Sequence, residues 1–520
     1  MANSPATSPD HEERDVQLLS NGAVRKRKGT TRSREGCLVC RKRRVKCDET
    51  HPCCKRCLVT RRPCVWPDPS RRGNRAVVLA PAEPLRPALN DAAARPNTAG
   101  ARALSYFQYK SAQEFAGYFD GQFWGVTVLQ MGHREPCVNQ LLVALGALHE
   151  GFRNEPVLRP DPDAVMLRHR ANEEYTKAIR LFIQHIEERE WTSLDVTLTC
   201  AALCIAFEWL RGTAHDANHH LKESLNTMAQ WLNGDAPDSN STKIKSPQGE
   251  FIRTQLKPIF VTMALHTRTL NEPPKIPLPV IESEHIDLER FSNVHQARDS
   301  LVFLLAKSFP EAVSHYTVDP DTASPGDIYL QLEKWGHCLD KFIAEHEGMD
   351  RDPRVAILRL WHIGAKLLYY GENGDSELFY DKFSSDFESQ VDLAEWLVSE
   401  SMIPRCRFSI DMGALPTLYY TAVKCRHPGT RRRAIDLMKA WPRREAVYDS
   451  LACAALAAEI VKIEEGDDFV TCETDVPKSS RISGKIRSEF EVSDIGERVN
   501  KLWIKREGEK EWTDYREVRW

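Results

Sequence analysis

The feature that most constrains this chain is a dense and regularly spaced run of cysteines near its N-terminus. The pattern Cys-x2-Cys-x6-Cys occurs twice, and its six members are Cys37, Cys40, Cys47, Cys54, Cys57 and Cys64. Two intervening residues return the chain to the same side, so each Cys-x2-Cys pair can offer two thiolates to one metal ion. Residues 1–15 carry acidic side chains and no apolar segment, which is not typical of a secretion signal. Metal binding is therefore favoured over disulfide bonds.

The number of cysteines indicates how many metal ions the run holds. Zinc prefers four thiolate or imidazole ligands arranged as a tetrahedron. Six cysteines around one zinc would leave two unused, whereas two separate zinc ions would need eight ligand positions. Six thiolates satisfy two ions when two of them bridge both metals, so we expect a cluster of two zinc ions. The alternative, a redox or disulfide cluster, fits the internal symmetry of the run poorly.

One position in the pattern is ambiguous, because Cys53 and Cys54 are adjacent. Cys54 makes the two halves of the run identical, while Cys53 would leave three residues before Cys57. We therefore interpret Cys54 as the ligand and Cys53 as a bystander. Few apolar residues surround the run, and modules of this size usually need a metal to fold. Zinc binding and folding of the segment are thus expected to be one equilibrium.

Positive charge is concentrated around the cysteines. Between Arg25 and Arg72 there are 17 lysines and arginines against four acidic residues, a balance of +13, so the rest of the chain must carry −16 to reach the net charge of −3. A basic head on an acidic body predicts a polyanionic partner at one end only. Five cations fall within six residues beside the second cysteine, at Arg41, Lys42, Arg43, Arg44 and Lys46.

Such a density of cations is typical of a surface that neutralises nucleic-acid phosphates. The alternative is a solvated charged turn, although like charges this close repel unless an anion compensates them. A second basic run, Arg25, Lys26, Arg27 and Lys28, is typical of a nuclear import signal or an additional phosphate-binding arm. A basic disordered tail without a receptor is the other interpretation of that run.

The rest of the chain divides by composition. We expect a disordered basic tail over 1–33, the cysteine module over 34–66, a Pro/Ala-rich linker over 67–103, an all-α domain over 104–470 and a charged C-terminal segment over 471–520. Apolar residues with helical spacing predict a helix that starts at Pro136. The same spacing predicts helices near 164–188, 194–211, 215–232, 250–269, 298–308, 326–345, 353–370, 391–402, 414–425, 430–440 and 444–465.

Strand patterns are almost absent before the last fifty residues. There, Leu502 to Ile504 and Trp512 to Trp520 predict a small hairpin. The large helical domain contains none of the sequence motifs that are typical of metalloproteases, P-loop enzymes, serine hydrolases or dinucleotide-binding enzymes, so no catalytic residue is predicted and the chain is not expected to be an enzyme. No apolar run approaches the ~20 residues that span a bilayer, so no membrane partner is expected.

The cysteine run and its neighbours, from Gly36 to Glu49 and from Pro52 to Cys64, closely resemble the fungal binuclear zinc-cluster transcription factors. The resemblance implies two zinc ions, with Cys37 and Cys54 as bridging ligands and the other four cysteines as terminal ligands. It also implies that a short helix after the second cysteine enters the major groove and reads a CGG-like triplet. Arg44 occupies the position where the family most often has a base-reading lysine, and arginine can pair with guanine O6 and N7.

Parts of the body resemble, more loosely, the helical regulatory domain that follows many such zinc clusters. They include Phe119 to Trp124, Phe207 to Gly212 and Pro442 to Glu445. The resemblance implies a nuclear transcription regulator of the RNA polymerase II type with double-stranded DNA, the transcription machinery and co-regulators as partners. No coiled coil follows the cysteines, so a homodimer would form through the helical domain, and binding as a monomer is the alternative. The alternative function is a zinc-dependent scaffold that binds RNA or protein.

Overall fold

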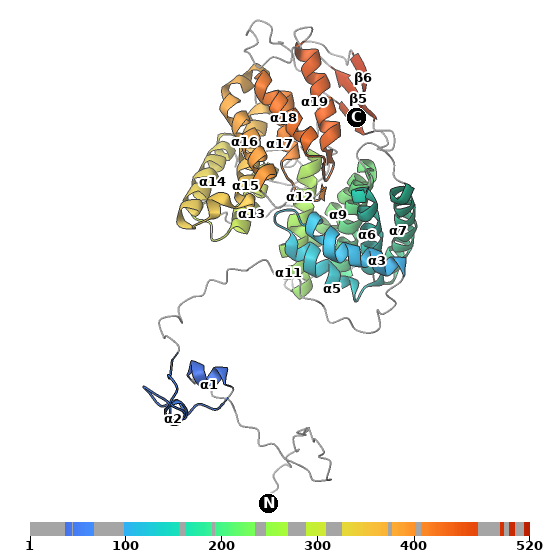
Figure 1. Cartoon of the computed structure of the whole chain (residues 1–520). Coiled ribbons are helices and arrows are strands. Elements are labelled where there is room, and N and C mark those ends of the chain that lie inside the picture. The colour runs from blue at the N-terminus through green and yellow to red at the C-terminus, as the bar shows by residue number, and fades with distance from the viewer. Residues whose placement is uncertain are drawn as a thin grey trace, which may run out of the picture. The chain divides into compact units, whose positions relative to one another are not determined.

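The computed structural model describes residues 37–43, 45–66, 98–154, 162–189, 193–233, 246–268, 288–307, 325–372, 377–400, 407–465, 489–492, 499–504 and 514–520. The chain separates into two compact units, Met1–Ala94 and Arg95–Trp520, which we call the head and the body. Within the head, two short helices are described, α1 (Leu38–Lys42) and α2 (Lys55–Val59) (Figure 1).

The body is built mainly from helices (Figure 1). Its first group comprises α3 (Ala99–Tyr106), η3 (Phe107–Ser111), α4 (Ala112–Phe115), η4 (Phe123–Thr127), α5 (Val128–Gly132), α6 (Pro136–Asn154), α7 (Pro162–Arg189), α8 (Leu194–Arg211), α9 (Ala214–Asn233), α11 (Pro247–Phe251), η6 (Ile252–Leu256) and α12 (Lys257–Arg268). Its second group comprises α13 (Val294–Lys307), α14 (Pro325–Glu345), η8 (Met349–Arg351), α15 (Pro353–Glu372), η9 (Glu377–Phe383), α16 (Ser384–Glu400), α17 (Leu415–Lys424), α18 (Pro428–Ala440) and α19 (Ser450–Glu465). The expectation of a large, mostly helical domain is confirmed.

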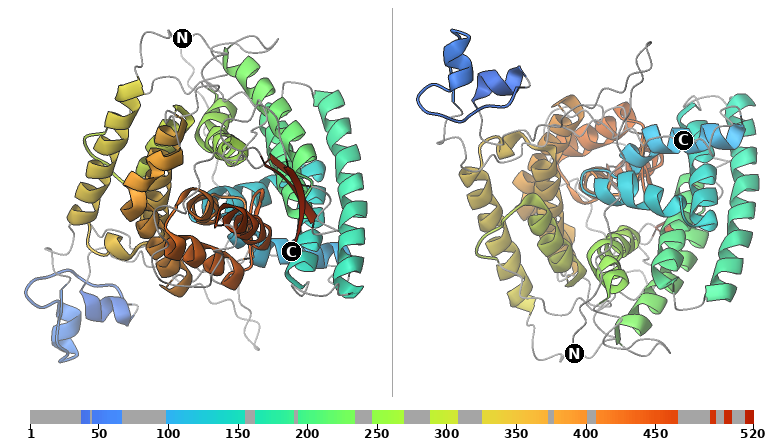
Figure 2. Two further views of the ribbon diagram at one scale, coloured as in Figure 1. Left: turned by 90° about the horizontal axis from the view of Figure 1, so that it is seen from above. Right: turned by 90° about the horizontal axis from the view of Figure 1, so that it is seen from below.

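The two groups of helices lie on opposite sides of the body, as Figures 1 and 2 show. Helix α12 packs against both α9 of the first group and α13 of the second. One continuous apolar core runs through both groups, from Ala103 in α3 to Ile460 in α19. Helix α8 is buried at almost every position because its sequence is apolar on all sides, and it packs against α6 and α9.

Close contact between α3 and α6 depends on a glycine. A Cβ atom at Gly146 would lie 2.0 Å from the carbonyl oxygen of Ala103, closer than non-bonded atoms can approach. The absence of a side chain at Gly146 therefore lets the two helix backbones meet.

No described helix is long and apolar enough to cross a membrane.

Two small sheets interrupt the helical pattern. The strands β4 (Glu489–Val492), β5 (Val499–Ile504) and β6 (Asp514–Arg519) form an antiparallel sheet in that order, with β5 and β6 at the segments where a hairpin is expected. The strands β1 (Phe408–Ser409), β2 (Arg444–Glu445) and β3 (Tyr448–Asp449) form a second sheet, with β1 parallel to β2 and β2 antiparallel to β3. The expectation that strands are almost absent before the last fifty residues is wrong for this second sheet.

The second sheet also corrects the start of the last helix. The sequence pattern predicts a helix over 444–465, but α19 begins only at Ser450. The Asp449 carboxylate accepts hydrogen bonds from the backbone N–H groups of Leu451 and Ala452, at 3.1 Å each, and so caps the helix there.

Two buried charged residues of β2, Arg444 and Glu445, form hydrogen bonds with the ends of other helices. Arg444 donates from Nη1 to the carbonyl oxygens of Trp209 and Leu210, at 3.3 and 2.9 Å, in the last turn of α8. Glu445 accepts a 2.8 Å hydrogen bond from the backbone N–H of Leu415 at the start of α17, and its Oε1 lies 2.9 Å from Nε of Arg443. Neighbouring residues of β2 thus satisfy one helix end from each group.

Removing the buried carboxylate of this arrangement is predicted to destabilise the body strongly. The Glu445→Ala variant leaves the buried guanidinium of Arg443 without the carboxylate it faces and α17 without a hydrogen-bond acceptor, which costs about 3–5 kcal/mol. Urea unfolding of the full chain, followed by circular dichroism, measures the change. As a control, Glu395→Ala removes an exposed pair with Arg433 and is expected to cost less than ~1 kcal/mol. Equal effects of the two substitutions would contradict the role assigned to Glu445.

Candidate metal centre and nucleic-acid interface

Four of the six cysteines, two from each half of the sequence repeat, occupy matching positions on the two short helices of the head. Cys37 directly precedes α1 and Cys40 lies within it, while Cys54 directly precedes α2 and Cys57 lies within it. The backbone N–H of Cys40 donates to Sγ of Cys37, and the backbone N–H of Cys57 donates to Sγ of Cys54, both at 3.4 Å. The two Cys-x2-Cys turns therefore have the same local geometry, as the sequence symmetry predicts.

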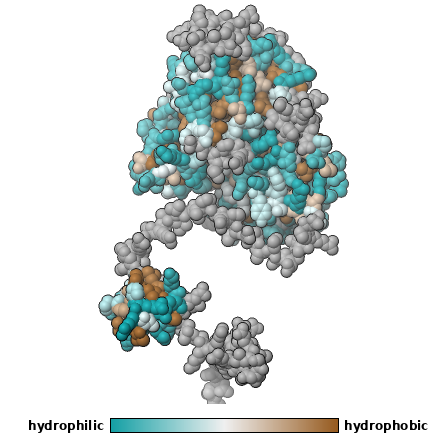
Figure 3. Space-filling view, viewed as in Figure 1, coloured by the Kyte–Doolittle hydropathy of each residue, from teal (hydrophilic) through white to brown (hydrophobic). Residues whose placement is uncertain are grey.

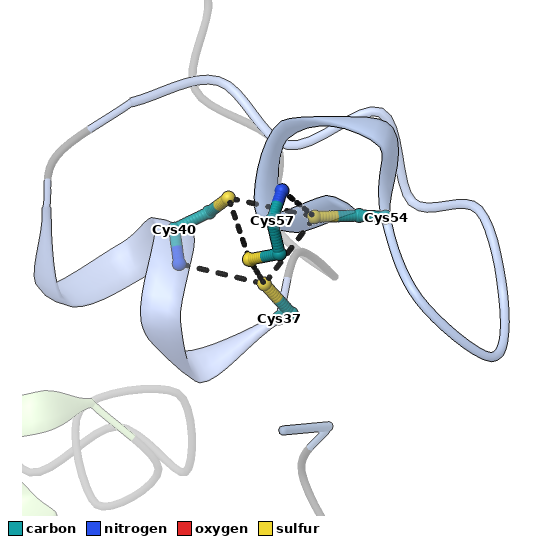
Figure 4. A group of neighbouring side chains, drawn as sticks. All are labelled: Cys37, Cys40, Cys54 and Cys57. Atoms are coloured by element: carbon teal, nitrogen blue, oxygen red, sulfur yellow. Dashed lines mark hydrogen bonds between the residues drawn. The ribbon is translucent and has the colours of Figure 1, made fainter. Parts of the chain in front are cut away.

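The sulfur atoms of these four buried cysteines converge (Figure 4). Sγ of Cys37 lies 3.8 Å from Sγ of Cys54 and 3.7 Å from Sγ of Cys57. Sγ of Cys40 lies 3.7 and 4.0 Å from the same two sulfurs. Thiolates bound tetrahedrally to zinc at about 2.3 Å are separated by about 3.8 Å, so this spacing suits zinc ligation.

The two remaining cysteines of the repeat lie beside this group. Sγ of Cys47 is within 4.8 Å of Sγ of Cys54 and of an Asp48 carboxylate oxygen, and its thiol also interacts with Cys37. Sγ of Cys64 accepts a 3.3 Å hydrogen bond from the backbone N–H of Cys54, and its thiol interacts with Cys37. All six cysteines are thus brought together, and Cys37 interacts with each of the other five.

Cys53 packs against the cysteine group, but its sulfur is not among the converging sulfurs. It is only partly buried, and its thiol donates to the backbone carbonyl of Cys54 at 3.8 Å. The structure therefore places Cys54, and not Cys53, among the converging thiols.

Close packing of the thiols shifts their proton affinities in opposite directions. Desolvation, aided by hydrogen bonds to Cys37 and Cys54, raises the pKa of Cys40 to about 12. Desolvation also acts on Cys37, but it is outweighed by hydrogen bonds from the N–H of Cys40 and from neighbouring thiols, which lower the pKa of Cys37 to about 6. A metal ion binds the thiolate forms, so loading this group with zinc must release protons.

Asp48 is a functional residue that the sequence interpretation missed. Its carboxylate accepts hydrogen bonds from the backbone N–H groups of Lys55 and Arg56, at 3.0 and 3.4 Å, and from the hydroxyl of Thr50. The Thr50 hydroxyl and the N–H of Lys55 lower the pKa of Asp48 to about 2. Asp48 therefore caps α2 and ties it to the segment that carries Cys47.

Trp66 packs against the cysteine group and joins two segments of the head. Its indole stacks on the ring of His51, with centroids 3.7 Å apart, and its Nε1 donates to the carbonyl oxygen of Pro52 at 2.9 Å. The neighbouring Val65 carbonyl accepts a 2.8 Å hydrogen bond from the N–H of Leu38, which joins the end of the module to its beginning.

The apolar side chains of the head do not build a core of their own. Leu58 and Val59 are 66% and 83% exposed, and Leu38, Val45 and Val65 are also exposed. Figure 3 shows hydrophobic patches on the surface of the head. The buried group in the head consists of cysteines, so its stability must come mainly from metal ligation.

The cations expected to contact phosphate are placed in part. Lys42, Arg43 and Lys46 are exposed. Arg41 lies in α1, but its side chain and the whole of Arg44 fall outside the described residues, as does the basic run Arg25 to Lys28. Arg43 donates from Nη1 to the hydroxyl of Thr60 at 3.5 Å, which connects the two halves of the head.

Further exposed cations belong to the second half of the head. They are Lys55, Arg56, Arg61 and Arg62. The sequence interpretation concentrated on the dense run beside Cys40 and did not assign them. Their signal was the same basic composition, spread more thinly over α2 and the turn that follows it.

Comparisons with known proteins agree with these features. Residues 35–73 match the fungal Zn(2)-Cys(6) binuclear cluster domain, and residues 102–297 match the fungal specific transcription factor domain. Two regions of the chain thus match domains of the fungal zinc-cluster transcription regulators, which confirms the resemblance of the sequence to that family. The match of the head to the Zn(2)-Cys(6) domain implies that it binds zinc.

Individual relatives match over very different lengths. The aspercryptin biosynthesis cluster-specific transcription regulator atnN of Emericella nidulans is 22% identical, over 84% of this chain and 88% of that protein. Transcription factor lfc1 of Flammulina velutipes is 49% identical over 15% of this chain and 25% of its own length. Zinc cluster transcription factor CZF1 of Candida albicans is 52% identical over 8% of this chain and 10% of its own length. No solved structure matches the chain.

The contacts of Trp66 predict its contribution to zinc retention. Trp66→Ala removes the hydrogen bond to Pro52 and the stack on His51. The equilibrium constant for transfer of zinc from the protein to a chelator is therefore expected to rise on the order of tenfold. A competition titration with a chromogenic chelator measures it. Val59→Ala, at the most exposed apolar residue of the described head, is the matched control and should leave zinc retention unchanged. Wild-type retention in Trp66→Ala would exclude a role for the indole in holding the head closed.

Proposed function

We propose that this protein is a nuclear, sequence-specific DNA-binding transcription regulator of genes read by RNA polymerase II, and that a cluster of two zinc ions builds its DNA-binding surface. The observation that carries the proposal is the convergence of six cysteines in a head whose surface is rich in exposed cations. The matches of the two regions to domains of fungal transcription factors support the same assignment.

The cluster holds its two ions through shared ligands. Cys37 and Cys54 would bridge the two metals; in support, each of them interacts with all five other cysteines of the repeat. Cys40, Cys47, Cys57 and Cys64 would be the terminal ligands. Zinc held in this way would neutralise thiolate charge, and its cysteine ligands would fix the two helices of the head relative to each other.

The fixed head then presents cations to a DNA duplex. Lys42, Arg43 and Lys46, together with Arg41, contact phosphates and hold α1 toward the major groove. Arg44 reads guanine through O6 and N7, so the preferred site contains a CGG-like triplet. Because phosphate contacts release counterions, the affinity falls steeply as salt is raised. The basic run Arg25 to Lys28 serves nuclear import.

The body couples DNA binding to other proteins. Its two groups of helices share one core and one set of buried charges, so it can transmit an effector or co-regulator signal as a unit. The transcription machinery and co-regulators are its proposed partners, and a homodimer would form through its helices. The Emericella nidulans relative that matches 84% of this chain is named as a regulator of one biosynthetic gene cluster.

Adjacent cysteines provide a matched pair of variants for the ligand assignment. Cys54→Ser removes a bridging ligand from both metals and is expected to abolish binding to DNA, because the head no longer folds around zinc. Cys53→Ser changes a thiol that bonds only to the neighbouring carbonyl in the described head, and it should leave affinity within about twofold of wild type. Fluorescence anisotropy with a labelled duplex measures both, and equal losses would overturn the assignment.

Selection from random duplex DNA tests the function itself. The wild-type protein is expected to enrich a G/C-containing triplet, and Arg44→Ala should lose about 1–3 kcal/mol of discrimination at one guanine. Lys46→Ala is the control, since loss of a phosphate contact weakens binding without changing the selected sequence. Absence of any enriched sequence would reject sequence-specific binding and favour a zinc-dependent scaffold that binds RNA or protein.

A further inference from the structure

Eight cysteines lie outside the zinc-cluster pattern and its bystander Cys53, and two of them meet inside the body. Sγ of Cys137 lies 3.6 Å from Sγ of Cys200, although 63 positions separate them in the sequence. Both side chains are buried, with Cys137 2% exposed and Cys200 0% exposed. Nothing in the proposed DNA-binding function requires this pair.

The two thiols belong to helices that pack directly against each other. Cys137 is the second residue of α6, next to the exposed Pro136, and Cys200 lies near the middle of α8. A disulfide requires the sulfurs to come within about 2.0 Å, so they need to approach by about 1.6 Å. Changes in the two side-chain torsion angles supply movement of this size without separating the helices.

The surroundings of the two sulfurs differ, so that one thiol is the better nucleophile. Cys137 sits in the first turn of a 19-residue helix, where backbone N–H groups stabilise negative charge. The thiol of Cys200 and the N–H of Val138 hold the pKa of Cys137 below its usual value, with desolvation in opposition. Desolvation raises the pKa of the more deeply buried Cys200. Cys137 is therefore the better nucleophile and Cys200 the resolving thiol.

We propose that Cys137 and Cys200 form an oxidative modification site that converts to a disulfide with a small hydroperoxide as oxidant. The Cys137 thiolate attacks one peroxide oxygen, so that an S–O bond forms, the O–O bond breaks and the leaving hydroxide takes a proton to become water. The sulfur of Cys200 then attacks the sulfenic acid, so that the S–S bond forms, the S–O bond breaks and a second water leaves. Two thiols are oxidised by two electrons in total, and one peroxide is reduced by two.

Burial of the pair restricts the oxidant to a small molecule. Cys137 is almost fully covered, but it follows the exposed residues His133, Arg134 and Pro136 at the start of α6. Hydrogen peroxide can reach such a sulfur, whereas the attack of glutathione disulfide requires room for a bulky tripeptide. The product would link the beginning of α6 to the middle of α8 and close a loop that contains α7.

The test uses the full-length, zinc-loaded protein treated with hydrogen peroxide. Remaining thiols are alkylated, the protein is digested without reduction, and linked peptides are identified by mass spectrometry. The proposal expects a Cys137–Cys200 linkage that forms at least several-fold faster with hydrogen peroxide than with glutathione disulfide. Absence of this linkage in the folded wild type, preferential linkage to Cys204, or equal rates with the two oxidants would overturn it.

Variants separate the roles of the two sulfurs. Cys200→Ser is expected to stop the reaction at the sulfenic acid, with a several-fold rise in dimedone labelling at Cys137 relative to wild type, and Cys137→Ser should yield no linkage from Cys200. Cys453→Ala is the control, because this buried thiol lies in α19 and should leave the linkage unchanged. Unchanged dimedone labelling in Cys200→Ser, checked for native circular dichroism, would exclude Cys200 as the resolving thiol. Peptide mapping of the wild type decides the proposal even where a variant does not fold.

Discussion

The structure of the head depends on one constraint, which is the convergence of its thiols at a place where they can bind metal. Its apolar residues, such as Leu58 and Val59, are largely exposed, so hydrophobic burial contributes little. Sulfurs from both halves converge at separations of 3.7–4.0 Å, and the hydrogen bonds of Asp48 and Trp66 hold the connecting segments around them. Metal ligation, folding and the presentation of cations are therefore aspects of a single equilibrium.

The body follows a different physical rule, because burial of apolar helix faces accounts for most of it. Charged groups appear in its core where helices end. Arg444 donates a hydrogen bond to a carbonyl oxygen in the last turn of α8, and Glu445 accepts one from the first backbone N–H of α17. Removal of either side chain would lower the stability of the body strongly, because a buried helix end would lose its hydrogen-bond partner. The short β2 strand thus connects helices from the two groups.

Much of the architecture could be predicted from the sequence, for reasons that differ between the two units. In the head, the spacing of the cysteines was sufficient to select Cys54 over Cys53. The symmetry of the repeat and the geometry of a pair of metal ligands both require two residues between the paired cysteines. In the body, helical periodicity located most helices to within a few residues. The pattern failed at 444–449, where Arg444 and Glu445 satisfy distant helix ends and Asp449 caps α19. A contact between residues as far apart in the sequence as Arg444 and Trp209 produces no periodic pattern of apolar residues.

The missed residues of the head illustrate the same limit. Asp48 and Trp66 act through the N–H groups of α2 and the carbonyl of Pro52, partners that are fixed only once the chain has folded. By contrast, the exposed cations Lys55 and Arg61 were visible in the composition and were overlooked because the run beside Cys40 is denser. Local chemistry could therefore be inferred, whereas long-range hydrogen bonds could not.

The proposed function depends on six thiolates that share a pair of metal ions, and counting the metal in the intact protein is the sharpest test of that arrangement. Native mass spectrometry of the full-length chain, purified with zinc and without chelator, gives the mass of bound metal per molecule. We expect two zinc ions that are lost together as a chelator is added, because bridging by the sulfurs of Cys37 and Cys54 would couple them. A single zinc ion per chain, or none in a head that stays folded, would contradict it.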